Sequence, residues 1–76
     1  MEHVVVVHKA EEGGYWAEVP ALEGCFAQGE TLEEALDDAR GAIASHIAAL
    51  RDDGQPVPSG SGVLIATVQT PEVLGA

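Results

Sequence analysis

The segment from residue 31 to residue 54 constrains the fold most, because it carries both start and stop signals for one long helix. Thr31 and Glu34 have the spacing of a capping box, in which each side chain accepts a hydrogen bond from a backbone N–H of the first turn. Gly54 is predicted as the glycine that follows the C-cap. Gly41, inside the helix, predicts close packing on a sheet. The apolar residues recur every three or four positions and form one stripe: Leu32, Leu36, Ala39, Ile43, Ile47 and Leu50.

Three short strand patterns precede this helix and one follows it. The first is rich in β-branched residues and does not alternate with polar ones, which indicates a central strand buried on both faces. The second alternates between apolar and other residues and ends at Pro20, which cannot donate to a strand ladder. The predicted strands are His3–His8, Tyr15–Val19, Cys25–Gln28 and Val63–Val68.

The order strand, strand, strand, helix, strand predicts an α+β fold. A meander followed by a right-handed helical crossover places the fourth strand parallel to the first and the third. The expected β-β-β-α-β architecture is thus a four-stranded sheet in the order 3-2-1-4, with the helix packed on one face. A position beside the fourth strand also explains why residues 4–7 include no polar residue. We expect a single domain over residues 1–68 and a flexible C-terminal tail over residues 69–76.

The charge excludes one large class of function. The 76 residues include 13 Asp and Glu but 3 Lys and Arg, for a formal net charge of −10. Recognition of nucleic-acid phosphates needs clustered Lys and Arg, so we expect no direct DNA binding. A single cysteine fits a reducing compartment, and neither a signal peptide nor a membrane span is visible. We therefore expect a cytoplasmic protein.

No group of residues has the spacing of a catalytic, cofactor or metal site. His3 and His8 lie five residues apart in a strand pattern and point to opposite faces, and His46 has no partner at a ligand spacing on the helix. Cys25 has no histidine base assigned to it and is interpreted as a small buried residue. We predict a protein that is not an enzyme and that uses no cofactor or metal.

One face of the predicted sheet has no helix to cover it. If Tyr15, Ala17 and Val19 face the helix, then Trp16 and Glu18 lie on the uncovered side. An exposed apolar patch of this kind usually marks an interface, and Trp is enriched among residues that anchor binding. A homo-oligomer of two or more copies and a foreign partner would cover the patch equally well.

Three motifs together resemble the HicB-type antitoxin family. They are the EEGGY of residues 11–15, the VPALEGCF of residues 19–26 and the QGETLEEA of residues 28–35. The similarity continues to residues 53–58 and covers most of the chain, from about residue 4 to residue 68. This resemblance implies a partial ribonuclease-H-like α+β unit, which agrees with the strand order above.

The resemblance also implies a function. Members of the family bind a small basic HicA-type mRNA interferase, a ribonuclease that depends on a histidine, and block its site. A domain of charge −10 can present carboxylates where such a toxin would hold RNA phosphates. From exposure and charge, we expect Glu11, Glu12, Trp16 and Glu18 to contact the toxin.

The chain departs from the family pattern in one respect. HicB-type antitoxins commonly add a C-terminal ribbon-helix-helix or helix-turn-helix segment that binds operator DNA, whereas this sequence has no basic segment after residue 68. This supports the expectation that the chain does not bind DNA. The alternative function is an orphan scaffold that self-associates through the Trp16 face and has a different toxin partner or none.

Overall fold

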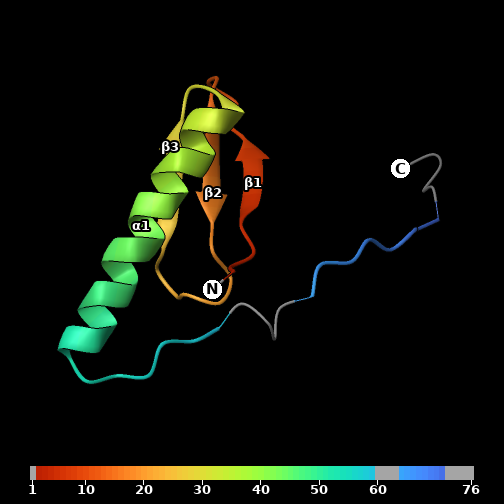
Figure 1. Cartoon of the computed structure of the whole chain (residues 1–76). Coiled ribbons are helices and arrows are strands. Elements are labelled where there is room, and N and C mark those ends of the chain that lie inside the picture. Colours follow the sequence, from red (N-terminus) through yellow and green to blue (C-terminus); the bar gives the residue numbers. More distant parts are fainter. Residues whose placement is uncertain (1, 60–63, 72–76) are drawn as a thin grey trace.

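The structure is a computed structural model that describes residues 2–59 and 64–71. Three antiparallel strands, β1 (Val6–Lys9), β2 (Tyr15–Glu18) and β3 (Phe26–Gly29), precede one long helix, α1 (Leu32–Asp52). The helix crosses one face of the sheet obliquely (Figure 1). The predicted α+β class and the order of the first four elements are confirmed.

The predicted four-stranded sheet is wrong for the residues that the structure describes. The sheet has three strands in the order β1-β2-β3, and residues 64–68 form no strand. Their large side chains are exposed, with Leu64 at 93%, Ile65 at 62% and Val68 at 83%. The sequence pattern of this segment indicates a high strand propensity. A segment with that propensity forms a strand only where a neighbouring strand and a buried face are available. Val63 and residues 72–76 of the predicted tail lie outside the described residues, and the domain bounds 1–68 stay a prediction.

Small residues carry the central contact between α1 and the sheet. Ala17 on β2 and Ala27 on β3 form a buried cluster with Ala39 of the helix. Ala35, one turn earlier on α1, is fully buried as well. The predicted stripe therefore meets the sheet through alanines, whereas its large members are half-buried or, in the case of Leu32, 48% exposed. Side chains this small allow the helix backbone to approach the strands closely.

The glycine at the close approach is Gly29, not Gly41. A Cβ atom built on Gly29 would lie 2.4 Å from the backbone nitrogen of Ala35, whereas one built on Gly41 would meet nothing within 4 Å. Gly41 is exposed on α1. The prediction that Gly41 marks close packing on the sheet is therefore wrong, because periodicity alone does not show which helix face a glycine occupies.

Both ends of α1 are capped by the residues around them. The Thr31 Oγ1 accepts from the Glu34 N–H (3.1 Å), and the Glu34 carboxylate accepts from the Glu30 N–H (3.0 Å). This is a capping box whose return bond lies one residue before the N-cap. At the other end Gly54 has a φ of 70°, its N–H donates to Arg51, and the Gln55 N–H donates to the Leu50 carbonyl (2.8 Å). These two bonds form a Schellman motif.

The loop between β2 and β3 builds a second core under the later turns of α1. Val19, Leu22 and Cys25 are buried together and pack against half-buried helix residues that include Ile43 and Ile47. Leu22 is 1% exposed, and backbone bonds between Val19, Leu22 and Cys25 hold the loop closed. The loop therefore acts as part of the core rather than as a surface connection.

Burial raises the pKa of the Cys25 thiol above its ordinary value. Cys25 is 4% exposed, so we expect it to react with Ellman's reagent at pH 8 at least about 10-fold more slowly in the folded chain than in urea, because the reagent has little access to the thiol and the thiolate is the reactive form. The unfolded chain ionises at lower pH, so stability falls as pH rises above the ordinary thiol pKa. Cys25→Ala should remove that fall. Equal labelling rates in the folded and unfolded chain would contradict this assignment.

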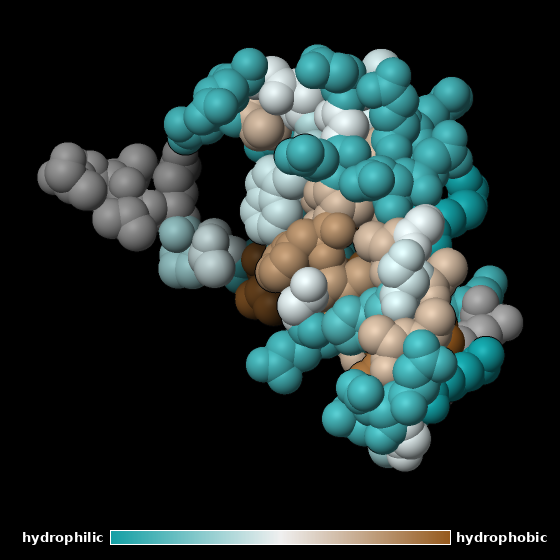
Figure 2. All heavy atoms as spheres, turned by 90° about the vertical axis from the view of Figure 1, so that its left-hand side faces the viewer, coloured by the Kyte–Doolittle hydropathy of each residue, from teal (hydrophilic) through white to brown (hydrophobic). Residues whose placement is uncertain are grey.

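The two edges of the sheet differ. At the β3 edge, the backbone N–H of Gln28 donates to the carboxylate of Asp38 on α1 (3.0 Å). The β1 edge has no partner strand among the described residues. The surface seen from the α1 side is hydrophilic over its upper part, with an apolar area at mid-height (Figure 2). The helix therefore protects one edge of the sheet and leaves the other available.

Candidate partner-binding surface

The sheet face opposite α1 is the candidate site, and we call it the open face. Strand register fixes its members, since Val7, Ala17 and Ala27 are paired neighbours on the helix side. Residues one position away on each strand point to the other side. The open face therefore consists of Val6, His8, Trp16, Glu18, Phe26 and Gln28. Trp16 and Glu18 lie where the sequence placed them.

Three rings run across the open face from β1 to β3. The His8 and Trp16 rings stack with centroids 4.1 Å apart and planes 15° apart. The Trp16 and Phe26 rings are tilted by 48°, with centroids 6.5 Å apart. Trp16 is 39% exposed and Phe26 61%. A rigid row of exposed rings supplies apolar contact area at low cost in side-chain entropy, which is the property of a binding anchor.

Glu18 is held in place by His8. The His8 Nε2 lies 2.8 Å from a Glu18 carboxylate oxygen, and each side chain is 39% exposed. A pair this exposed contributes little to stability. Its effect is on position, because the contact fixes the Glu18 carboxylate beside Trp16 and orients the stacked imidazole.

The turn between β1 and β2 brings Glu12 to the edge of the open face. Gly13 and Gly14 take positive φ values of 103° and 79°, which form the tight turn after Glu12. Glu12 and Trp16 line one hollow of about 430 Å³. Glu11 is exposed in the same turn but does not line the hollow. Of the four predicted contact residues, the structure therefore places Glu12 and Glu18 close to Trp16, and Glu11 apart.

Sequence reasoning missed two of the three rings on the open face. His8 was considered only as a metal ligand, and Phe26 was given no role. Both could have been found from strand register, because His8 pairs with Trp16 and Phe26 pairs with Glu18. Residues paired across antiparallel strands share a face. The missing information was the register itself, which the sequence patterns leave open by one residue.

Within residues 2–59 and 64–71, no three His, Cys, Asp or Glu side chains converge as metal ligands would. None of the helices in that part of the chain is long and apolar enough to span a bilayer. The chemistry that the described side chains do assemble is an aromatic row flanked by carboxylates.

Comparisons with known proteins agree on one family. Residues 3–76 match the family model described as a HicB-like antitoxin of bacterial toxin-antitoxin systems. A UPF0150 protein of Thermoplasma acidophilum is 41% identical over 58 residues, which cover 76% of this chain and 84% of that protein. A UPF0150 protein of Archaeoglobus fulgidus is 31% identical over 72 residues, covering 92% of this chain and 99% of the relative.

Among solved structures, a chain of a HicA3 and HicB3 toxin-antitoxin complex is similar. It is 34% identical, has a TM-score of 0.59, and the match covers 74% of this chain and 67% of that one. The family-model match spans nearly the whole sequence, and the structural match supports it. The chain belongs to the HicB-like antitoxin family of bacterial toxin–antitoxin systems.

Proposed function

We propose that this chain neutralises a small basic HicA-type mRNA interferase by covering its RNA-binding and catalytic surface with the open face. The observation that carries the proposal is the exposed row formed by His8, Trp16 and Phe26, flanked by carboxylates. Family membership and the similarity to a chain of a HicA3–HicB3 complex support the class of partner. The chain acts here as a binding protein in the cytoplasm, not as an enzyme, and contacts no DNA itself.

The electrostatics favour a basic partner. The chain carries a net charge of −10, Glu12 and Glu18 lie on or beside the open face, and Glu11 is exposed in the adjoining turn. The helix-start carboxylates are already engaged, since Glu34 caps α1 and Asp38 holds β3. We therefore assign toxin contact to Glu11, Glu12, Trp16 and Glu18. Carboxylates at these positions would occupy the places of RNA phosphates on a basic toxin surface and speed its association.

The direct experiment is co-expression with the product of the adjacent gene, followed by purification of any complex. The purified toxin should cleave RNA, and a stoichiometric amount of this chain should abolish cleavage. A complex that leaves cleavage intact, or a chain that binds no adjacent product, would contradict the proposal. The second outcome would favour the alternative, an orphan scaffold whose exposed aromatic row binds another copy of the chain.

Charge reversal shows whether these three glutamates guide the toxin to the open face or whether only the net charge of the chain matters. In Glu11→Lys/Glu12→Lys/Glu18→Lys, we expect the association rate constant for the toxin to fall at least about 10-fold at low salt, because the charges that guide encounter are inverted. The control Glu23→Lys/Asp52→Lys/Asp53→Lys changes net charge equally at residues that lie away from the open face. Stopped-flow measurements at two salt concentrations give both rates. Equal slowing in the two variants would remove these three residues from the contact.

A further inference from the structure

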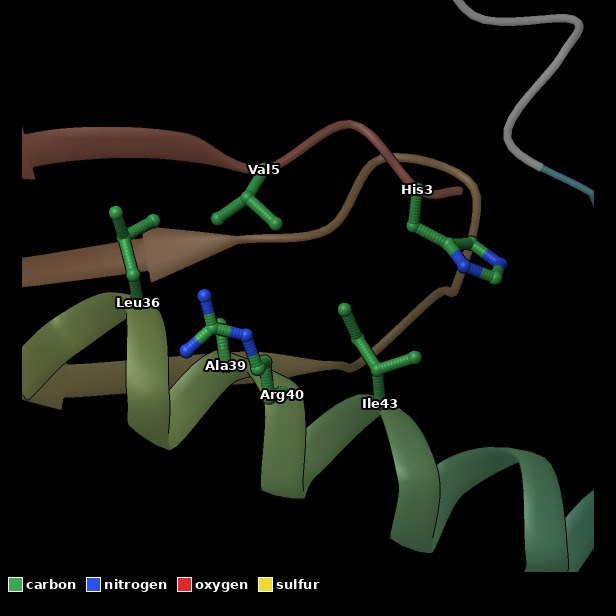
Figure 3. Close-up of a pocket in the computed structure, with 6 residues that line it drawn as sticks. All are labelled: His3, Val5, Leu36, Ala39, Arg40 and Ile43. Carbon is green, nitrogen blue, oxygen red and sulfur yellow. The ribbon is translucent and has the colours of Figure 1, made fainter. Parts of the chain in front are cut away.

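A groove lies between α1 and the N-terminal part of the chain, next to the unpaired edge of β1. It has a volume of about 400 Å³ and is lined by His3, Val5, Leu36, Ala39, Arg40 and Ile43. Val5 points from the strand side toward α1, and Leu36, Ala39 and Ile43 point from the helix toward the strand (Figure 3). The large residues Leu36 and Ile43 are half-buried, so this side of the predicted stripe lacks a complete partner surface.

The unpaired edge and the groove are adjacent, and together they form a site for an added strand. Among the described residues, β1 pairs with β2 alone, so its outer backbone groups are available. An added strand would complete the backbone ladder and place alternate side chains in the groove. The occupant should be extended, and apolar on the face that meets Leu36, Ala39 and Ile43.

The same chain carries a segment of this description. Residues 64–71 contain no charged residue, and the run Leu64–Val68 has apolar or β-branched side chains at every position. All of these residues are exposed and outside the sheet. Leu64 and Val68 would lie on one face of a strand about 13 Å apart, at about 3.3 Å per residue. Leu36 and Ile43 lie seven positions apart on the helix, or about 10 Å at 1.5 Å per residue. Leu64 and Val68 can therefore contact Leu36 and Ile43.

We propose that Leu64–Val68 of one copy adds to the β1 edge of a second copy and fills its groove, while the second copy does the same in return. The segment stands away from the sheet of its own chain (Figure 1). Before it, Pro56 and Pro58 restrict Gln55 and Val57 to extended conformations. In the single chain the segment is exposed and its own groove is open, and a second copy presents the same groove to it. Because each copy offers one segment and one groove, reciprocal exchange uses every site.

This dimer leaves the open face accessible and enlarges it. If Leu64 and Val68 enter the groove, Ile65 and Thr67 point to the opposite side, beside Val6 of the receiving copy. The inference is thus separate from the proposed toxin binding, and its test needs no toxin. It assigns dimerisation to the β1 edge rather than to the Trp16 face.

Sedimentation velocity of the full chain from about 1 to 300 µM tests the proposal. We expect a dimer, and we expect Leu64→Asp/Val68→Asp to raise the dimer dissociation constant at least about 30-fold, because a carboxylate entering the groove would lose its hydration. These residues are exposed in the single chain, so helical circular dichroism should not change. The control Gln69→Asp/Thr70→Asp adds the same charge beyond the proposed strand and should still dimerise.

A mixing experiment identifies the exchange. Leu36→Asp blocks the groove but keeps the segment, whereas Leu64→Asp/Val68→Asp keeps the groove. Each alone should be largely monomeric, and an equimolar mixture should form a heterodimer. A monomeric wild-type chain would overturn the proposal and favour docking of the segment in its own groove. A dimer lost in Trp16→Ala but kept in Leu64→Asp/Val68→Asp would overturn it in favour of the open face.

Discussion

Gly29→Ala should lower the free energy of unfolding by about 3 kcal/mol or more, at the upper end of the range for an overpacked core. The added Cβ would lie 2.4 Å from the Ala35 nitrogen and 2.7 Å from the Glu34 carbonyl carbon. Both are backbone atoms in the first turn of α1, so no side-chain rotation relieves the contact. The helix must shift away from β3, which also loosens the alanine contact between Ala27 and Ala39.

Gly41→Ala is the matched control and should have the opposite sign. No atom lies within 4 Å of the new Cβ, and the residue is exposed inside α1. Replacing a helical glycine by alanine stabilises by up to about 1 kcal/mol. Urea unfolding of both variants, followed by circular dichroism at 222 nm, measures the two changes. A Gly29→Ala chain as stable as wild type would show that α1 does not approach β3 as closely as described.

Trp16→Ala should weaken toxin binding by about 2 kcal/mol or more, which corresponds to about 30-fold in the dissociation constant. Trp16 contacts both other rings of the open face, so its removal also frees His8 and Phe26. The effect should appear mainly as faster dissociation, because anchors act after encounter. This separates it from the charge-reversal variant, which should act on association.

Leu32→Ala is the matched control for the tryptophan. Leu32 is 48% exposed on α1, away from the open face, so its truncation also removes exposed apolar surface. We expect binding of this control to stay within about threefold of wild type, because surface residues outside an interface rarely matter. Isothermal titration calorimetry with the co-purified toxin measures both. Similar losses in the two variants, or none in Trp16→Ala, would place the interface elsewhere.

The parts of the fold that depend on local interactions could be predicted from the sequence. The cap at Thr31 and the glycine turn at Gly54 involve residues within a few positions of each other, and α1 begins and ends close to them. The first three strands were found to within a few residues, although β1 begins at Val6 rather than His3. Alternation also placed Ala17 in the core and Trp16 outside it.

The parts that depend on distance between elements could not be predicted in the same way. The apolar stripe gave the correct helix face but not the fact that alanines make the contact, because periodicity does not measure how closely two backbones approach. For the same reason the close approach between helix and sheet was assigned to Gly41, whereas it lies at Gly29. The fourth strand was predicted from propensity, yet whether Leu64–Val68 pairs at all depends on a neighbour that propensity does not describe.

The candidate site was predicted in part for the same reason. Trp16 and Glu18 followed from alternation along one strand, which a sequence displays directly. His8 and Phe26 join them only through pairing with two other strands, and pairing depends on turn geometry. The positive φ values of Gly13 and Gly14 belong to the turn that sets the first of these registers.

The hydrogen bond from Gln28 to Asp38 sets a limit on how these chains can assemble. Fibre growth by direct edge-to-edge pairing of sheets requires a unit with two open edges, so that each added copy presents a new edge to the next. Here the carboxylate of Asp38 occupies a backbone donor on the outer side of β3, and α1 lies along that side. Growth can therefore proceed from the β1 side alone. Direct pairing of β1 edges therefore ends at two copies, whereas addition of Leu64–Val68 segments ends only where the exchange is reciprocal.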